Sequence, residues 1–170
     1  MATKAQIDAA TRIHERARYL RGRFLNYVAV IERDIAMILT DHFCVNNEEK
    51  RQLFFKHVVN GYFFSLNLKK DLLVKIVKKD YPRYWDENGQ ILKNLDDIIS
   101  FRNKLAHSVV DVSEQALARP IEEGIGFIEW KEGEPITDAA FQEWEAKANM
   151  VSGCLSDIRQ LLPFKEKSEA

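Results

Sequence analysis

The stretch from Ile91 to Val109 reads ILKNLDDIISFRNKLAHSV. It decides the fold, because the rest of the chain is expected to pack around it. On a helix with about 100° between successive residues, its apolar side chains form one continuous stripe around Leu95. The stripe comprises Ile91, Leu92, Leu95, Ile98, Ile99, Leu105, Ala106 and Val109. A stripe of this width is typical of a helix that packs along its length on other helices.

Three polar residues accompany the stripe near its C-terminal end. Arg102 lies at roughly −20° from Leu95, inside the stripe, and Asn103 and His107 lie together on its flank. A guanidinium on an apolar face must be paired or must border a polar cleft, because its desolvation otherwise costs several kcal/mol. The sequence thus gathers an arginine, an amide and an imidazole where this helix meets another surface.

Similar helical patterns precede this stretch. Residues 4–40 carry apolar side chains at alternate spacings of three and four, which predicts a long first helix with Gly22 as a candidate kink or break. A second helix should begin after the Asn46-Asn47 pair and run to about Asn60. Its inward residues are expected to be Leu53, Phe54 and Val58.

A third helix, capped by Ser65 or Asn67, is predicted to run to Lys79, where the Tyr81-Pro82 pair stops it. Its buried side is expected to comprise Leu68, Leu72, Leu73, Ile76 and Val77. Its lysines are expected mostly on the outside, at Lys69, Lys70, Lys75, Lys78 and Lys79. Residues 81–89 are then interpreted as a loop over a packing cluster of Tyr84 and Trp85.

The C-terminal third of the chain adds one short β element and one more helix. Residues 124–136 are rich in β-branched and aromatic side chains with a turn at Glu132-Gly133, which predicts a small hairpin. Thr137 then caps a last helix that Pro163 terminates. The expected fold class is all-α, a bundle of four to five helices with a small β-hairpin before the last one. We expect a single helical domain over residues 1–164 and a disordered tail over residues 165–170.

The composition limits the classes of function. The 170 residues are 46% apolar and 30% charged, as in soluble globular proteins. No run approaches the roughly 18 apolar residues of a membrane span, and the N-terminus lacks the apolar core of a signal peptide. Cys44 and Cys154 are single and far apart, which predicts neither a disulfide nor a zinc site. We expect a soluble cytoplasmic protein with no membrane partner, no metal and no other cofactor.

The net charge of −1 is unevenly distributed along the chain. Residues 1–33 hold seven Lys and Arg against three Asp and Glu, whereas residues 111–145 hold two against ten. A polyanion such as RNA would therefore approach the N-terminal side, where Arg16, Arg18 and Arg23 are weak candidates for RNA contacts. The alternative is that the two oppositely charged helix faces simply dock on each other.

Arg102, Asn103 and His107 remain the best candidates for chemistry, because the chain contains no metal-binding, nucleotide-loop or serine-hydrolase motif. A histidine can move a proton near neutral pH, an arginine can neutralise a phosphate, and an asparagine can orient the imidazole. A symmetric dimer would supply a second histidine, and the small Ala106 would permit close approach. The alternative is structural: Arg102 pairs with Glu32 or Asp34, and His107 caps its helix.

The string Arg102-Asn103-Lys104-Leu105-Ala106-His107 resembles the R-N-x-x-A-H form of the R-x4–6-H motif of the HEPN superfamily. The order of the expected elements resembles prokaryotic members over nearly the whole chain. The resemblance implies an all-α, often dimeric, metal-independent endoribonuclease of toxin–antitoxin or defence systems. It assigns catalytic roles to Arg102 and His107, with Asn103 assisting them.

The resemblance also implies alternatives to catalysis, because members of the superfamily differ in activity. Some lack activity and bind RNA or protein, and mannitol-repressor-like regulators share a related helical fold. The expected partners are RNA and a second copy of the chain, with an antitoxin or other regulatory protein as a further partner. The alternative function is a non-catalytic binding module or regulator.

Overall fold

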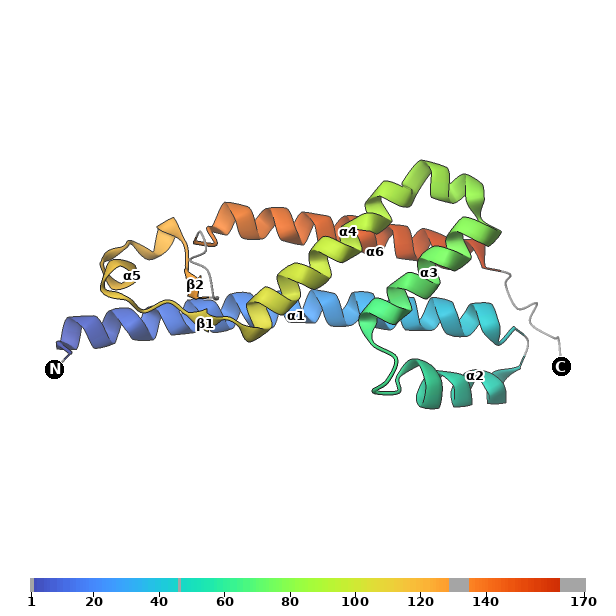
Figure 1. Ribbon diagram of the computed structural model, residues 1–170, viewed down its shortest axis with the longest axis horizontal. Coiled ribbons are helices and arrows are strands. Elements are labelled where there is room, and N and C mark those ends of the chain that lie inside the picture. Colours follow the sequence, from blue (N-terminus) through green and yellow to red (C-terminus); the bar gives the residue numbers. More distant parts are fainter. Residues whose placement is uncertain (1, 46, 129–134, 163–170) are drawn as a thin grey trace. The chain divides into compact units, whose positions relative to one another are not determined.

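The computed structural model describes residues 2–45, 47–128 and 135–162 (Figure 1). Its elements, in order, are α1 (Lys4–Phe43), α2 (Glu48–Phe54), a π-helical turn η1 (Phe55–Val59), α3 (Leu66–Asp80), α4 (Pro82–His107), β1 (Val109–Val110), α5 (Glu114–Ala118), a 3-10 turn η2 (Ile121–Glu123), β2 (Phe127–Ile128) and α6 (Asp138–Leu161). The predicted all-α class, with a small antiparallel strand pair before the last helix, is confirmed.

The chain divides into two compact units, and the long helices α1, α4 and α6 each contribute to both. The first unit comprises Met1–Tyr27 and Ser100–Ala146. The second unit comprises Val28–Ile99 and Lys147–Ala170. The single domain over residues 1–164 stays a prediction, and the tail predicted over residues 165–170 lies outside the described residues.

The core of the first unit is an aromatic cluster that joins three helices. Phe101 of α4 stacks on Trp144 of α6, with ring centroids 4.3 Å apart and planes within 6° of each other. The Phe101 ring also meets Phe24 of α1 edge-on at 4.8 Å, and Phe24 lies 6.1 Å from Phe141. Since Phe24 is fully buried, this cluster fixes the end of α4 between α1 and α6.

The core of the second unit is aliphatic. It is formed by apolar faces of α1, α3, α4 and α6, and its fully buried members include Ile31, Ile35, Ile38, Leu39, Leu73, Leu92, Leu95, Ile98 and Leu155. Lys69 was expected outside, but it is only 4% exposed, and its Nζ lies 2.5 Å from Glu32 Oε1. The prediction was wrong because a lysine can enter a core edge when a carboxylate pairs with its charge.

The strand pair differs from the predicted hairpin. Val109 and Val110 of β1 pair antiparallel with Ile128 and Phe127 of β2, so Val109 lies on a strand rather than on the predicted helical stripe. Within residues 124–136 an isolated bridge joins Ile125 and Ile136, as a hairpin over that stretch requires. The predicted turn at Glu132-Gly133 lies outside the described residues.

The predicted loop over residues 81–89 is wrong, because α4 begins at Pro82 and continues through Gly89. Proline suits the first helical position, where its missing N–H would have no intrahelical partner. A Cβ atom on Gly89 would lie 2.8 Å from the ring of Trp85. The missing side chain therefore leaves space for that ring against the helix. Lys78 covers the same ring, with Nζ 4.5 Å from its centroid.

Two shorter helices begin as predicted but bury other residues. Asn47 caps α2 by accepting from the Lys50 N–H at 2.8 Å, and Ser65 caps α3. Leu53, Val58 and Leu68, which were expected inside, are 53%, 38% and 49% exposed. The π-helical turn adds a residue to the helical repeat, so that Val59 takes the buried position expected for Val58.

Replacing Gly22 with alanine is predicted to stabilise the protein. The helix α1 runs through Gly22 without a break, and a Cβ atom there would meet nothing within 4 Å. Gly22→Ala should therefore raise the free energy of unfolding by about 0.5–1 kcal/mol, because alanine loses less backbone entropy. Urea unfolding measures this change. Gly89→Ala is the contrasting variant, and equal stabilisation by both would contradict the packing described for Trp85.

Cys154 is predicted to react slowly with alkylating reagents. Its side chain is buried, and the Tyr84 hydroxyl donates to its backbone carbonyl at 3.1 Å. Burial raises the pKa of the Cys154 thiol, so a smaller fraction is thiolate near pH 8 than in an unfolded chain. Iodoacetamide labelling of Cys44→Ser, with and without urea, should show at least tenfold slower labelling of the native protein. Equal rates would show that Cys154 is accessible.

Candidate functional site

Arg102, Asn103 and His107 lie in the last turns of α4, within the first unit. Asn103 and His107 are exposed, and Arg102 is half-buried. Arg102 Nη1 donates to Asn103 Oδ1 at 3.0 Å, so the amide orients the guanidinium rather than the imidazole. The structure places these three residues on neighbouring turns of one helix, where they can reach solvent together.

The opposite side of the same turns is anchored in the core. Phe101 and Leu105 are buried, with 6% and 0% of their surface exposed. Phe101 lies at about −120° from Leu95, outside the predicted stripe, and the sequence interpretation missed it. Near the helix end, the buried face of α4 is thus shifted around the helix axis toward Phe101. As a result, Arg102 and Ala106 are half-buried at the border of the core.

Neither partner proposed for Arg102 in the structural alternative binds it. Among the described residues no carboxylate lies within 4.0 Å of the Arg102 guanidinium. Glu32 pairs with Lys69, and Asp34 lies 3.8 Å from Arg33. Within the described part of the chain, Arg102 therefore carries a positive charge that no acidic side chain neutralises.

Arg21, not His107, binds the carbonyl that follows the motif. Its Nη2 donates to the Ser108 carbonyl oxygen, and its guanidinium carbon lies 5.1 Å from the Phe127 ring centroid. Arg21 is half-buried, unlike the exposed Arg18 and Arg23 of the same helix. Its spacing gave a signal, because it lies four residues after the buried Ala17 and three before Phe24.

The basic face of α1 is partly neutralised by α6. Arg16 pairs with Asp138, and Arg23 Nε lies 2.6 Å from Glu145 Oε1. The docking of oppositely charged helix faces is thus observed at these two residues. Arg18 is exposed and has no ion-pair partner among the residues that the structure describes. Contact of RNA with Arg16, Arg18 and Arg23 stays a prediction.

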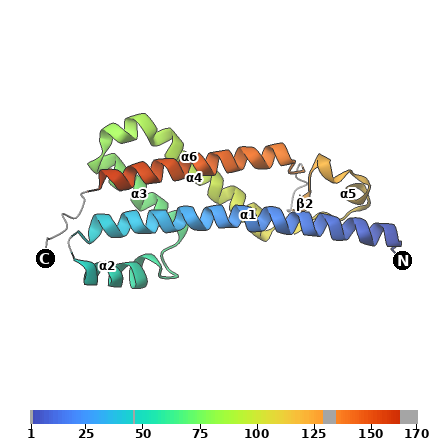
Figure 2. The ribbon, with the colours of Figure 1, turned by 180° about the vertical axis from the view of Figure 1, so that it is seen from behind.

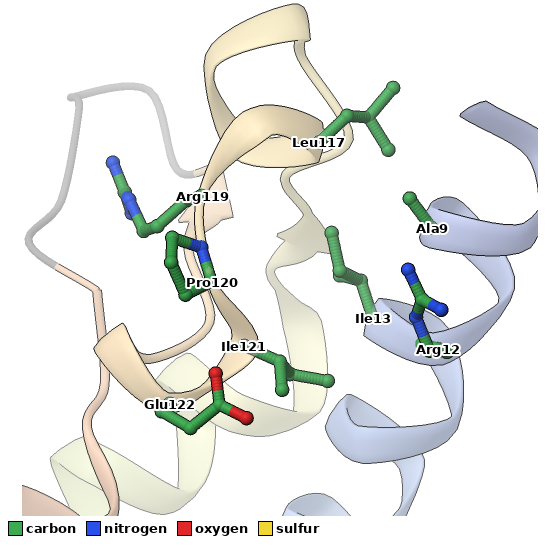
Figure 3. Close-up of a pocket in the computed structure, with 8 residues that line it drawn as sticks. All are labelled: Ala9, Arg12, Ile13, Leu117, Arg119, Pro120, Ile121 and Glu122. Atoms are coloured by element: carbon green, nitrogen blue, oxygen red, sulfur yellow. The ribbon is translucent and has the colours of Figure 1, made fainter. Parts of the chain in front are cut away.

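A separate cavity lies in the first unit, beside the N-terminal part of α1. It has a volume of about 360 Å³ and is lined by Ala9, Arg12, Ile13, Leu117, Arg119, Pro120, Ile121 and Glu122. Figure 3 shows Arg119 pointing away from α1, so that its guanidinium does not converge with that of Arg12. None of the three motif residues lines this cavity.

Residues 2–45, 47–128 and 135–162 contain no group of three or more His, Cys, Asp or Glu side chains placed to hold a metal ion. Over the same ranges, every helix is too short or too polar to cross a membrane.

Comparison of the chain with models of known protein families, with curated proteins and with solved structures finds no match.

Arg21→Ala is predicted to loosen the segment that follows the motif. The variant removes a hydrogen bond from a charged donor to the Ser108 carbonyl, and the expected loss in unfolding free energy is about 1–3 kcal/mol. The Asp111 N–H, which donates to the Gly126 carbonyl at 2.9 Å beside the strand pair, should exchange faster with solvent. Urea unfolding and amide hydrogen exchange measure both effects.

Arg18→Ala is the matched control, because it removes an exposed arginine from the same helix and should change stability by less than about 0.5 kcal/mol. Equal behaviour of the two variants would mean that Arg21 does not hold the end of α4.

Proposed function

We propose that this chain is a HEPN-like, metal-independent endoribonuclease that acts as a homodimer. The proposal rests on the polar contacts of Arg102. Its guanidinium is bound by Asn103, and no carboxylate of the described residues pairs with it. A cation held at the surface without an acidic partner is suited to bind a phosphate. The exposed His107 lies five residues later on the same helix.

The proposed reaction needs no metal. The 2′-oxygen of a ribose attacks the adjacent phosphorus while the bond from phosphorus to the 5′-oxygen breaks. The products are a 2′,3′-cyclic phosphate and a 5′-hydroxyl, so the proton lost by the 2′-hydroxyl is matched by one gained by the leaving oxygen. Arg102 binds the phosphate as its charge increases, and His107 transfers one of the two protons. Asn103 holds the guanidinium in place.

A second copy supplies the other proton-transfer group in this proposal. One chain offers a single histidine at the motif, whereas concerted transfer to and from two oxygens needs an acid and a base. Two α4 helices related by a two-fold axis would place both histidines at one phosphate. The half-buried Ala106 beside Arg102 leaves little side-chain bulk in the way of a close approach.

The biological setting follows from the resemblance and belongs to the same proposal. A ribonuclease of this kind would act in the cytoplasm as a toxin or defence enzyme, with an antitoxin or another regulatory protein controlling it. The rival function is a non-catalytic binding module or a mannitol-repressor-like regulator. One observation favours the rival: Asp138 and Glu145 of α6 occupy Arg16 and Arg23, two of the three predicted RNA contacts.

The purified protein is predicted to cut single-stranded RNA in the presence of EDTA. His107→Ala and Arg102→Ala should each reduce the cleavage rate at least a hundredfold. General acid–base catalysis by the histidine and electrostatic stabilisation by the arginine each typically contribute that much. Asn103→Ala should reduce it less, since the amide acts through Arg102. The measurement is the initial rate of cleavage, with the 2′,3′-cyclic phosphate identified by mass spectrometry.

Arg119→Ala is the control for loss of an arginine in the same unit, and it should cut at the wild-type rate. Circular dichroism must show that each variant is folded. Cleavage that persists in His107→Ala would assign the activity elsewhere, and a pure protein that cuts no RNA would favour the binding module.

A further inference from the structure

Exposed apolar side chains gather between the end of α1 and the start of α3, all within the second unit. Tyr62 is 100% exposed, and the others are between 38% and 58% exposed. They are Phe43, Val45, Leu53, Val58, Phe63 and Leu68. Exposed apolar side chains are this closely spaced in the sequence of few soluble monomers, so this segment is a candidate interaction surface.

The helical part of this segment lies at the edge of its unit. Figures 1 and 2 show α2 alongside the C-terminal part of α1, on the side away from α6, and no residue of α2 is buried. The chain continues without interruption from α2 into η1, where the Asn60 N–H donates to the Phe55 carbonyl at 3.0 Å. Such π-helical turns often occur at functional sites. Residues 48–59 thus form one short rod with an outward side.

The outward side of this rod carries one acidic, one apolar and one basic residue in order. Glu49, Leu53 and Lys56 follow each other at spacings of four and three residues, which places them on one side of a helix. All three are exposed, and within the described residues neither Glu49 nor Lys56 forms an ion pair. This pattern is self-complementary, because its two ends carry opposite charges around a central leucine.

We propose that a second copy of this chain covers the surface, with the two rods packed antiparallel about a two-fold axis at Leu53. In that arrangement Glu49 of one copy faces the partner's Lys56, and the reverse contact is identical. Phe43 lies beside the rod, because its ring contacts Phe54 with the centroids 5.9 Å apart. Its exposed part therefore adds apolar surface next to Leu53.

The exposed rings and the charge of the surface favour a protein partner. Tyr62 and Phe63 are 100% and 58% exposed, and aromatic side chains are enriched at interfaces between proteins. The acidic Glu48 and Glu49 nearly balance the basic Lys50, Arg51 and Lys56. A nearly neutral surface lacks the excess positive charge that would attract RNA or an anionic membrane.

This pairing surface is separate from the α4 contact of the proposed ribonuclease dimer, so a chain with both contacts would associate beyond a dimer. It lies in the second unit, whereas Arg102 and His107 lie in the first. A protein that cuts no RNA can still form the pair, and loss of the pair can be measured without any substrate.

Charge reversal tests the pairing directly. Glu49→Lys and Lys56→Glu each place like charges opposite each other, so the dissociation constant measured by analytical ultracentrifugation should rise at least tenfold. The double variant Glu49→Lys with Lys56→Glu restores opposite charges and should recover the wild-type association. Failure of the double variant to recover, or single variants that associate like the wild type, would overturn the proposal.

The apolar contribution has its own test. Tyr62→Ser with Phe63→Ser should weaken association in the same assay, since both side chains are exposed and their loss does not open a core. Ile7→Ser, which changes a residue of similar exposure on α1 in the first unit, should leave association unchanged. A wild-type chain that stays monomeric at the highest attainable concentration would overturn both this pairing and the α4 dimer. A wild type that associates no further than Glu49→Lys would overturn this pairing alone.

Discussion

Phe101 stacks on Trp144 and meets Phe24 edge-on. Because these contacts bury Phe101, they fix how the last turns of α4 are rotated about the helix axis. Once Phe101 and Leu105 face the core, Arg102 and Ala106 lie at its border and Asn103 and His107 face solvent. The same constraint ends the helix beside α1, where Arg21 binds the Ser108 carbonyl. Packing of apolar residues therefore determines which polar residues are available for chemistry.

Polar contacts then distinguish the partly buried Arg102 from three arginines of α1. Arg16 and Arg23 bind carboxylates of α6, and Arg21 binds a backbone carbonyl, so these three stabilise the fold. Arg102 has an amide as its neighbour and no acidic partner among the described residues. An arginine in a folded protein is normally neutralised where it is partly desolvated, so an unneutralised one is suited to an anionic ligand.

Helical periodicity predicted the long helices and most of the core, and the polar residue types at Asn47, Ser65 and Thr137 predicted three helix caps. It failed where packing of a single side chain decides the outcome. Trp85 over Gly89 allows a helix where proline and glycine predicted a loop, and Glu32 allows Lys69 to be buried. The residues of the motif were found from spacing alone, whereas Phe101 and Arg21 were missed because their burial depends on contacts with distant segments.

The most direct measurement of the central claim is an NMR titration of the protein with a single-stranded RNA that carries 2′-O-methyl groups and cannot be cut. The account predicts that the imidazole signals of His107 and the guanidinium signals of Arg102 change together and saturate with one affinity. Saturable binding that changes signals elsewhere and leaves both residues unaffected would contradict the claim that the end of α4 is the RNA site.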